Sequence, residues 1–154
     1  MEVFKGQGND TYLASVMDLY DRKIIGWAYG KNITSELATQ AVKNACLNIP
    51  DTTGIVLHSD LGSQYTSEEF EKYLQDQGML HSFIRKGNPY DKACIESFHS
   101  VLKKEEVYTT TYYTFEEAKS ALFEYIESFY NRKRRHSALD YKTPQQVEDE
   151  ALAA

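Results

Sequence analysis

The chain has 154 residues, 42% hydrophobic and 26% charged, which excludes a disordered, collagen-like or membrane-spanning protein. Its formal net charge is −6, so the overall balance does not indicate a polyanionic partner, although residues 85–104 and 129–136 are locally basic. Two cysteines are too few for a disulfide framework. We therefore expect one cytoplasmic domain over residues 1–154, whose final segment of about 15 residues is a helical tail.

The first third of the chain predicts a β-hairpin, a helix and a buried strand. Residues 12–19 and 23–29 are rich in β-branched and aromatic residues on either side of a polar turn, and residues 1–4 are compatible with a further strand. Thr34 or Ser35 caps a predicted helix that reaches Asn48. The apolar run at residues 54–58 has the length of a strand buried on both faces.

The rest of the chain predicts four helices and one more strand. Thr66 and Glu69 form a capping box for a helix that ends at Gly78, and residues 79–84 read as a strand. After a loop at residues 85–90, helical patterns occupy residues 93–102 and the segment that follows Thr114. Thr143 and Pro144 begin a last helix. This order of elements predicts a mixed sheet covered by helices.

Two carboxylates are candidates for chemistry. Asp60 lies two residues beyond the strand at 54–58, where α/β proteins gather ligand sites, although a turn aspartate is the alternative. Glu96 lies early in a helix, and Lys103 returns to within about 20° of it two turns later. Taken alone, Glu96 is interpreted as a solvated helix glutamate. His58 is expected to be packed or hydrogen-bonded instead of metal-bound.

Asp60 and Glu96 are stronger candidates as a pair than alone, because 35 residues separate them. With that gap, the segments HSDLGSQY, RKGNPYDKACIESFHSVLKKE and YIESFYNRKRRHSALDYKTP resemble the catalytic core of bacterial insertion-sequence transposases, DDE enzymes related to retroviral integrases. The hairpin YLASVMDLYDRKIIGW also matches, so the resemblance runs from about Tyr12 to Val147. It implies a ribonuclease-H-like fold with a mixed five-stranded sheet flanked by helices. The implied activity is DNA cleavage followed by 3′-end strand transfer.

The resemblance also implies a metal site. Three carboxylates would hold two divalent ions, Mg²⁺ or Mn²⁺, and Asp60 and Glu96 match the second and third of them. By the family's spacing the first aspartate falls just before Met1, so the first strand is expected to be truncated and this chain to be inactive or nearly so. Asp10 and Asp18 are nearby acids that could replace it, but replacement by either is not favoured.

Several basic or polar residues match family positions that contact DNA. An element end and a target duplex are the implied partners, together with a second copy of the chain, because two DNA ends must meet and a homodimer is the simplest assembly. For the basic residues, a solvated charge run is the alternative interpretation. The candidate DNA-binding residues are Lys103, Arg85, Lys86, Asn88, Arg132, Arg134 and Arg135.

Two other functions stay open at this point. A ribonuclease-H-like nuclease would hydrolyse nucleic acid without strand transfer. A non-catalytic DNA-binding or oligomerisation module would be indifferent to the loss of Asp60 or Glu96. The acidic net charge suits an enzyme whose end recognition comes from a basic helix-turn-helix region upstream, which the resemblance implies.

Overall fold

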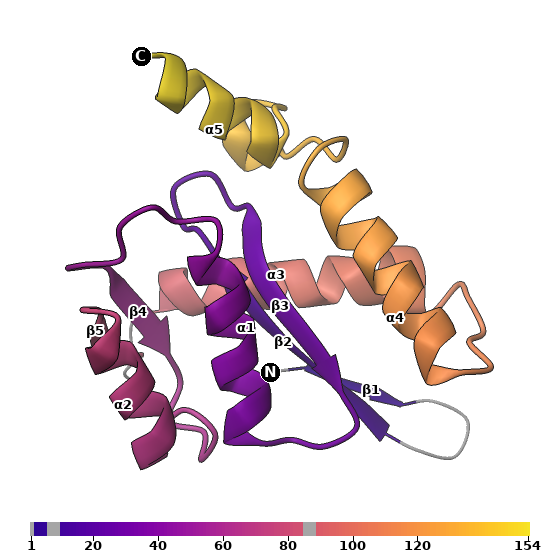
Figure 1. The fold of residues 1–154 in the computed structure, drawn as a ribbon. Helices are drawn as coiled ribbons and strands as arrows, with labels where there is room; N and C mark the ends of the chain where they lie inside the picture. The colour runs from indigo at the N-terminus through magenta and orange to yellow at the C-terminus, as the bar shows by residue number, and fades with distance from the viewer. Residues whose placement is uncertain (1, 6–9, 85–88) are drawn as a thin grey trace. The chain divides into compact units, whose positions relative to one another are not determined.

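The structure is a computed structural model and describes residues 2–5, 10–84 and 89–154 (Figure 1). The chain divides into two compact units. Unit 1 comprises Met1–Val16 and Ile25–Glu96, and unit 2 comprises Met17–Ile24 and Ser97–Ala154. Within the described ranges, no helix has both the length and the apolar character needed to cross a membrane.

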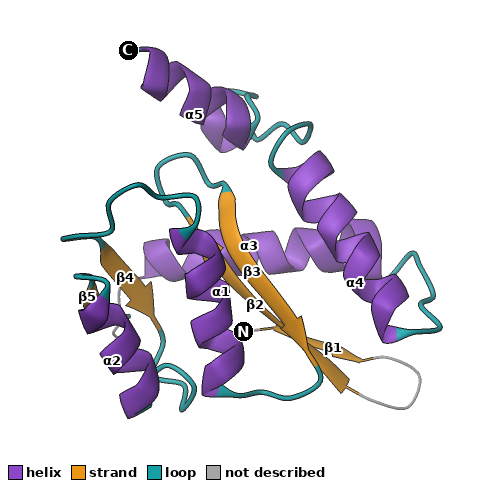
Figure 2. Ribbon diagram, in the orientation of Figure 1, coloured by secondary structure: helices purple, strands orange, loops and turns teal. Residues whose placement is uncertain are grey.

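Five short strands form two sheets (Figure 2). In the first, β1 (Glu2–Lys5), β2 (Asp10–Met17) and β3 (Ile24–Gly30) lie in that order, and β1 runs antiparallel to β2. In the second, β4 (Val56–Ser59) and β5 (Leu80–Phe83) run parallel. The predicted hairpin and the number of strands are confirmed.

The prediction of one continuous five-stranded sheet is wrong for the described chain. One edge of the first sheet is β1, which among the described residues pairs only with β2. At the other edge, carbonyl groups of β3 accept side-chain bonds from a helix: Asn44 Nδ2 donates to Trp27 O, and Asn48 Nδ2 to Ile25 O, both at 2.9 Å. These bonds satisfy strand carbonyls that another strand would otherwise pair with.

Helices α1 (Ser35–Cys46) and α2 (Glu68–Asp76) belong to unit 1. Thr34 caps α1 as predicted, its hydroxyl accepting from the backbone N–H of Leu37 at 3.2 Å. The predicted cap of α2 at Thr66 is wrong by one residue, because the Ser67 hydroxyl accepts from the N–H of Phe70. Gly78 follows α2 with a φ of 71°, a left-handed conformation that suits glycine.

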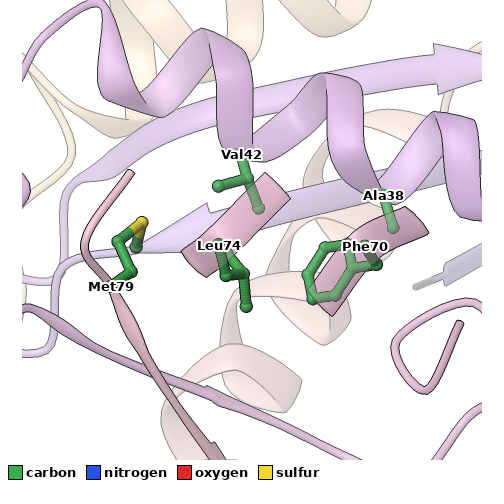
Figure 3. Packing of buried hydrophobic residues seen from close by; sticks show 5 residues of the cluster. All are labelled: Ala38, Val42, Phe70, Leu74 and Met79. Atoms are coloured by element: carbon green, nitrogen blue, oxygen red, sulfur yellow. The ribbon is translucent and has the colours of Figure 1, made fainter. Parts of the chain in front are cut away.

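The core of unit 1 lies between these helices and the strands. In Figure 3, Ala38 and Val42 of α1 face Phe70 and Leu74 of α2, with Met79 beside them. The helix also approaches the first sheet closely. A Cβ on Gly26 of β3 would lie 2.4 Å from a backbone nitrogen of α1, so only glycine fits there.

The strand β4 differs from its prediction. Leu57 packs against the core of unit 1, whereas Val56 and His58 are exposed. Its side chains therefore alternate between the core and solvent, and the predicted burial on both faces is wrong. His58 was expected to be packed or hydrogen-bonded, and in the described structure it is neither. A run of apolar letters cannot by itself distinguish these two strand types.

The helices of the second half contain irregular turns. Helix α3 (Pro89–Leu102) continues as a π-helical segment, η1 (Lys103–Val107), and α4 (Phe115–Phe123) continues as a second, η2 (Glu124–Tyr130). After the 3₁₀ turn η3 (Ser137–Leu139), α5 (Pro144–Ala153) begins with Thr143 as its cap, as predicted, and the structure adds a capping box between Thr143 and Gln146. The cap of α4 at Thr114 is also confirmed.

Asn131 joins distant segments of unit 2. Its side chain is buried and bonds to both backbone groups of Ile24: Oδ1 accepts from the N–H and Nδ2 donates to the carbonyl, each at 2.9 Å. Its own carbonyl accepts from the N–H of Gln145 at 2.8 Å. A side-chain amide thus pairs with the start of β3 as another strand would, and it holds the entry to α5.

Candidate active site

Asp60 directly follows the last residue of β4, one position nearer to the strand than predicted, and its side chain is exposed. Its Oδ1 accepts from the backbone N–H of Gly62 at 2.7 Å, which closes a tight turn. Within the described part of the chain, the second carboxylate oxygen has no hydrogen-bond partner. Asp60 is therefore both the turn aspartate of one interpretation and an exposed carboxylate of the other, because the two roles use different oxygens.

The charge of Asp60 affects a neighbouring tyrosine. The pKa of Tyr65 is raised to about 12, mainly by burial and further by the negative charge of Asp60. Tyr65 packs edge-on against Phe70 with ring centroids 5.5 Å apart, so the turn that carries Asp60 is anchored in the core of unit 1. A carboxylate fixed at the border of an apolar core is suited to bind a cation.

Behind Asp60 lies a chain of hydrogen bonds that the sequence did not suggest. The Oγ of Ser59 lies 2.7 Å from Nε2 of His81 and donates to the carbonyl of Asp60 at 3.0 Å. The Nδ1 of the same imidazole bonds to Glu71. These residues come from β4, β5 and α2, and Ser59 and His81 are 22 positions apart, so no local pattern could have revealed the contact.

Glu96 lies on α3 in unit 1, the same unit as Asp60. Its side chain is 60% exposed, and Oε1 lies 3.6 Å from Nζ of Lys92, one turn earlier. An exposed pair of this length contributes little to stability and does not commit the carboxylate. The apolar neighbours of Glu96 predict that it lies at the edge of the buried face of its helix. In the structure, Glu96 is exposed.

Two of the three carboxylates expected for the site are thus at exposed positions of one unit. Both donors are hard oxygens, and Mg²⁺ binds through one or two carboxylates completed by water and phosphate oxygens. The residues present therefore fit a divalent ion. Among the residues described, no three histidine, cysteine, aspartate or glutamate side chains lie together as a metal-binding group. Asp10 begins β2, and Asp18 accepts from the N–H of Tyr20 in the turn after β2.

The predicted DNA-binding residues fall into different environments. Arg132 and Arg135 are exposed, whereas Nε of Arg134 donates to both carboxylate oxygens of Glu105, at 2.8 and 3.0 Å. Lys103 is the first residue of η1 and is half-buried. The loop residues Arg85, Lys86 and Asn88 lie outside the described residues.

Arg134 is therefore already paired within the chain. Glu105 also accepts from the hydroxyl of Tyr125 at 3.2 Å, and burial followed by the charge of Glu105 raises the pKa of that tyrosine. The bonds join η1, η2 and the basic segment after it. The spacing of basic residues alone could not show that Arg134 has a partner within the chain.

Comparison with known proteins gives a consistent result. Residues 1–89 match one family described as integrase core domain, and residues 77–144 match a second with the same description. The transposase for insertion sequence element IS904 of Lactococcus lactis is 42% identical over 137 residues, which are 89% of this chain and 54% of the relative. Transposase InsF for insertion sequence IS3A of Escherichia coli is 37% identical over 142 residues, 92% of this chain and 49% of the relative. The chain spans about half the length of the curated relatives it matches.

A solved structure supports the fold. The integrase catalytic core domain of HTLV-2, in its dimeric form in complex with magnesium, superposes with a TM-score of 0.68 at 16% identity. The superposition covers 95% of this chain and 90% of that one. At this identity the likeness shows the fold alone, and it confirms the predicted α/β fold of an integrase-like core.

Proposed function

This chain belongs to the integrase core domain family, and on that premise we propose that it is the catalytic core of an insertion-sequence transposase. The proposed reaction is cleavage of DNA at the ends of an element, followed by attack of the freed 3′-hydroxyl on a target phosphodiester. The observation that carries the proposal is the exposure of Asp60, at the end of β4, and of Glu96, on α3, within one compact unit.

Asp60 and Glu96 are the proposed ligands of the metal ions. Two Mg²⁺ or Mn²⁺ ions, when bound, would supply activation of the attacking oxygen and stabilisation of the leaving oxygen. The turn at Gly62 holds Oδ1 of Asp60 and so limits the rotation of the carboxylate. The weak contact of Glu96 with Lys92 leaves the glutamate able to exchange a lysine for a metal ion.

DNA is the proposed partner, and the surface that binds it is proposed from the basic residues. Arg132 and Arg135 are the better candidates in the terminal signature, because both are exposed and neither has an ion pair within the described chain. Nε of Arg134 is already bonded to Glu105, which makes Arg134 the weaker candidate. Lys103 and the residues Arg85, Lys86 and Asn88 remain candidates by resemblance alone.

The proposal extends to the assembly and to the activity of the chain by itself. A homodimer is proposed because two DNA ends must be joined, and the HTLV-2 core is described in a dimeric form. A cytoplasmic location is proposed because both relatives come from bacteria. Inactivity of the 154 residues alone is also proposed, on the family's spacing, which puts the first aspartate before Met1.

The test compares this chain with one extended upstream to include the first strand expected of the family. Each is incubated with a labelled linear duplex and Mg²⁺ or Mn²⁺, and nicked and joined products are separated. We expect only the longer chain to nick and join. Hydrolysis without joining would support a nuclease instead. Unchanged DNA binding in Asp60→Asn and Glu96→Gln, with no cleavage by any form, would support a non-catalytic module.

A further inference from the structure

We propose that Glu71, His81 and Ser59 are positioning residues that hold Asp60 in place for metal binding. The inference rests on the proposed function, because it gives a role to groups that act only through Asp60. The three residues come from α2, β5 and β4, all in unit 1. None of them was a candidate from the sequence.

Hydrogen bonds connect Glu71 to the backbone of Asp60 through His81 and Ser59. The carbonyl oxygen of Asp60 only accepts, so the single hydroxyl proton of Ser59 is donated to it, at 3.0 Å. Nε2 of His81, 2.7 Å from the Ser59 Oγ, then donates to that oxygen, and Nδ1 is hydrogen-bonded to the carboxylate of Glu71. Every polar atom along this path has a partner.

Burial makes the chain of bonds specific. The His81 side chain is only 5% exposed, and Ser59 is 7% exposed. The imidazole lies between the rings of Phe70 and Phe83, with centroids 5.5 and 4.2 Å away. Polar groups in such surroundings are costly when unpaired, so the paired geometry is strongly preferred over rotated alternatives. The apolar rings set the position of the imidazole, and the imidazole sets that of the serine.

The end of β4 is the part of the fold that this arrangement controls. Ser59 is the last residue of the strand and lies opposite Phe83 in the parallel pairing with β5. Asp60 follows it and leaves the sheet. Its carbonyl is held by Ser59 and its Oδ1 by the N–H of Gly62. With backbone and one carboxylate oxygen fixed from two sides, the other oxygen is left as a pre-oriented ligand.

The test measures Mn²⁺ binding to the whole chain by paramagnetic broadening of its amide NMR signals. Ser59→Ala removes the hydroxyl, Glu71→Gln removes the charge at the far end, and Ser59→Thr keeps the hydroxyl. Outer groups of this kind change metal affinity by about 10- to 100-fold. We expect Ser59→Ala to weaken Mn²⁺ binding about tenfold, Glu71→Gln to weaken it less, and Ser59→Thr to bind within twofold of the unmodified chain.

Two controls make the outcome decisive. Glu69→Gln removes an exposed charge from the same helix and should leave Mn²⁺ binding unchanged. Thermal unfolding of each variant identifies a general loss of structure, and His81→Phe, which fills the same space between the two rings, separates packing from hydrogen bonding. If His81 acts as a positioning residue, His81→Phe should weaken Mn²⁺ binding while its unfolding midpoint stays close to that of the unmodified chain.

Asp60→Asn distinguishes failure of the inference from failure of the proposed function. If Asp60→Asn abolishes Mn²⁺ binding while Ser59→Ala and Glu71→Gln bind normally, the positioning role is wrong and the proposed function stands. If Mn²⁺ binding survives Asp60→Asn, both are wrong. If the affinity losses only follow the losses of thermal stability, or Ser59→Thr does not restore binding, the three residues are structural and the inference is overturned.

Discussion

Replacement of Asn131 by leucine should destabilise the chain strongly, because it leaves two buried backbone groups without partners. Asn131 is 1% exposed and supplies the partners of both the N–H and the carbonyl of Ile24, itself 1% exposed. A buried polar group left unpaired costs about 1–3 kcal/mol. Two such groups give about 2–6 kcal/mol, and the added apolar surface of leucine offsets about 1 kcal/mol. The expected loss is therefore about 3 kcal/mol.

Urea unfolding followed by circular dichroism measures this loss. With an m-value of about 2 kcal/mol per molar urea, the midpoint should fall by about 1.5 M. Asn48→Leu is the matched control, because its Nδ2 also donates to a strand carbonyl, that of Ile25, at 2.9 Å. Asn48 is exposed, so water can replace the lost bond and the cost should stay below about 1 kcal/mol. Equal losses in the two variants would refute the account of Asn131.

Three further predictions follow from individual groups. Gly26→Ala should cost about 3 kcal/mol or prevent folding, because its Cβ would lie 2.4 Å from a backbone nitrogen of α1; a thermal unfolding midpoint within a few degrees of the original would contradict this. Burial raises the pKa of Asp21 from 3.8 to about 6, so the contribution of protonated Asp21 to stability is complete below pH 3.8 and is lost as the pH rises through 6; Asp21→Asn should be about 1–2 kcal/mol more stable than the unmodified chain at pH 8 by urea unfolding, and equal stability would count against it. Replacing both Arg132 and Arg135 by alanine should remove about two phosphate contacts, which reduces the slope of log K for DNA binding against log salt concentration by about two and leaves the unfolding midpoint unchanged. An unchanged slope would exclude these residues from the DNA surface.

Local patterns in the sequence predicted most elements of the fold. Capping residues such as Thr34, Thr114 and Thr143 mark helix starts through contacts only three residues long, so they can be read from the chain directly. The error at Thr66 shows the limit of such signals, because Ser67 is an equally good cap one position later. Choosing between neighbouring caps depends on which start buries Phe70 and Leu74, a tertiary question.

Contacts between distant residues explain what the sequence could not predict. The bonds of Asn131 to Ile24, of Glu105 to Arg134, and of Ser59 to His81 join positions 22 to 107 residues apart. Neither spacing nor periodicity encodes such pairs. The division of the strands into two sheets could not be predicted either, because it depends on which distant residues pair with each strand edge. Asp60 and Glu96 could be proposed as site residues because their gap of 35 residues is itself a sequence feature.

Strand transfer by the upstream-extended chain carrying Asp60→Asn tests the central claim most directly. Asp51→Asn is its matched control, because Oδ1 of Asp51 also accepts from an N–H two residues later, that of Thr53, at 2.9 Å. The account predicts that Asp60→Asn lowers joining of a labelled 3′ end by about a hundredfold or more, since metal ligands supply several kcal/mol of transition-state stabilisation. Asp51→Asn should join within twofold of the unmodified chain. Joining by Asp60→Asn at the rate of Asp51→Asn would contradict the assignment of Asp60 as a metal ligand.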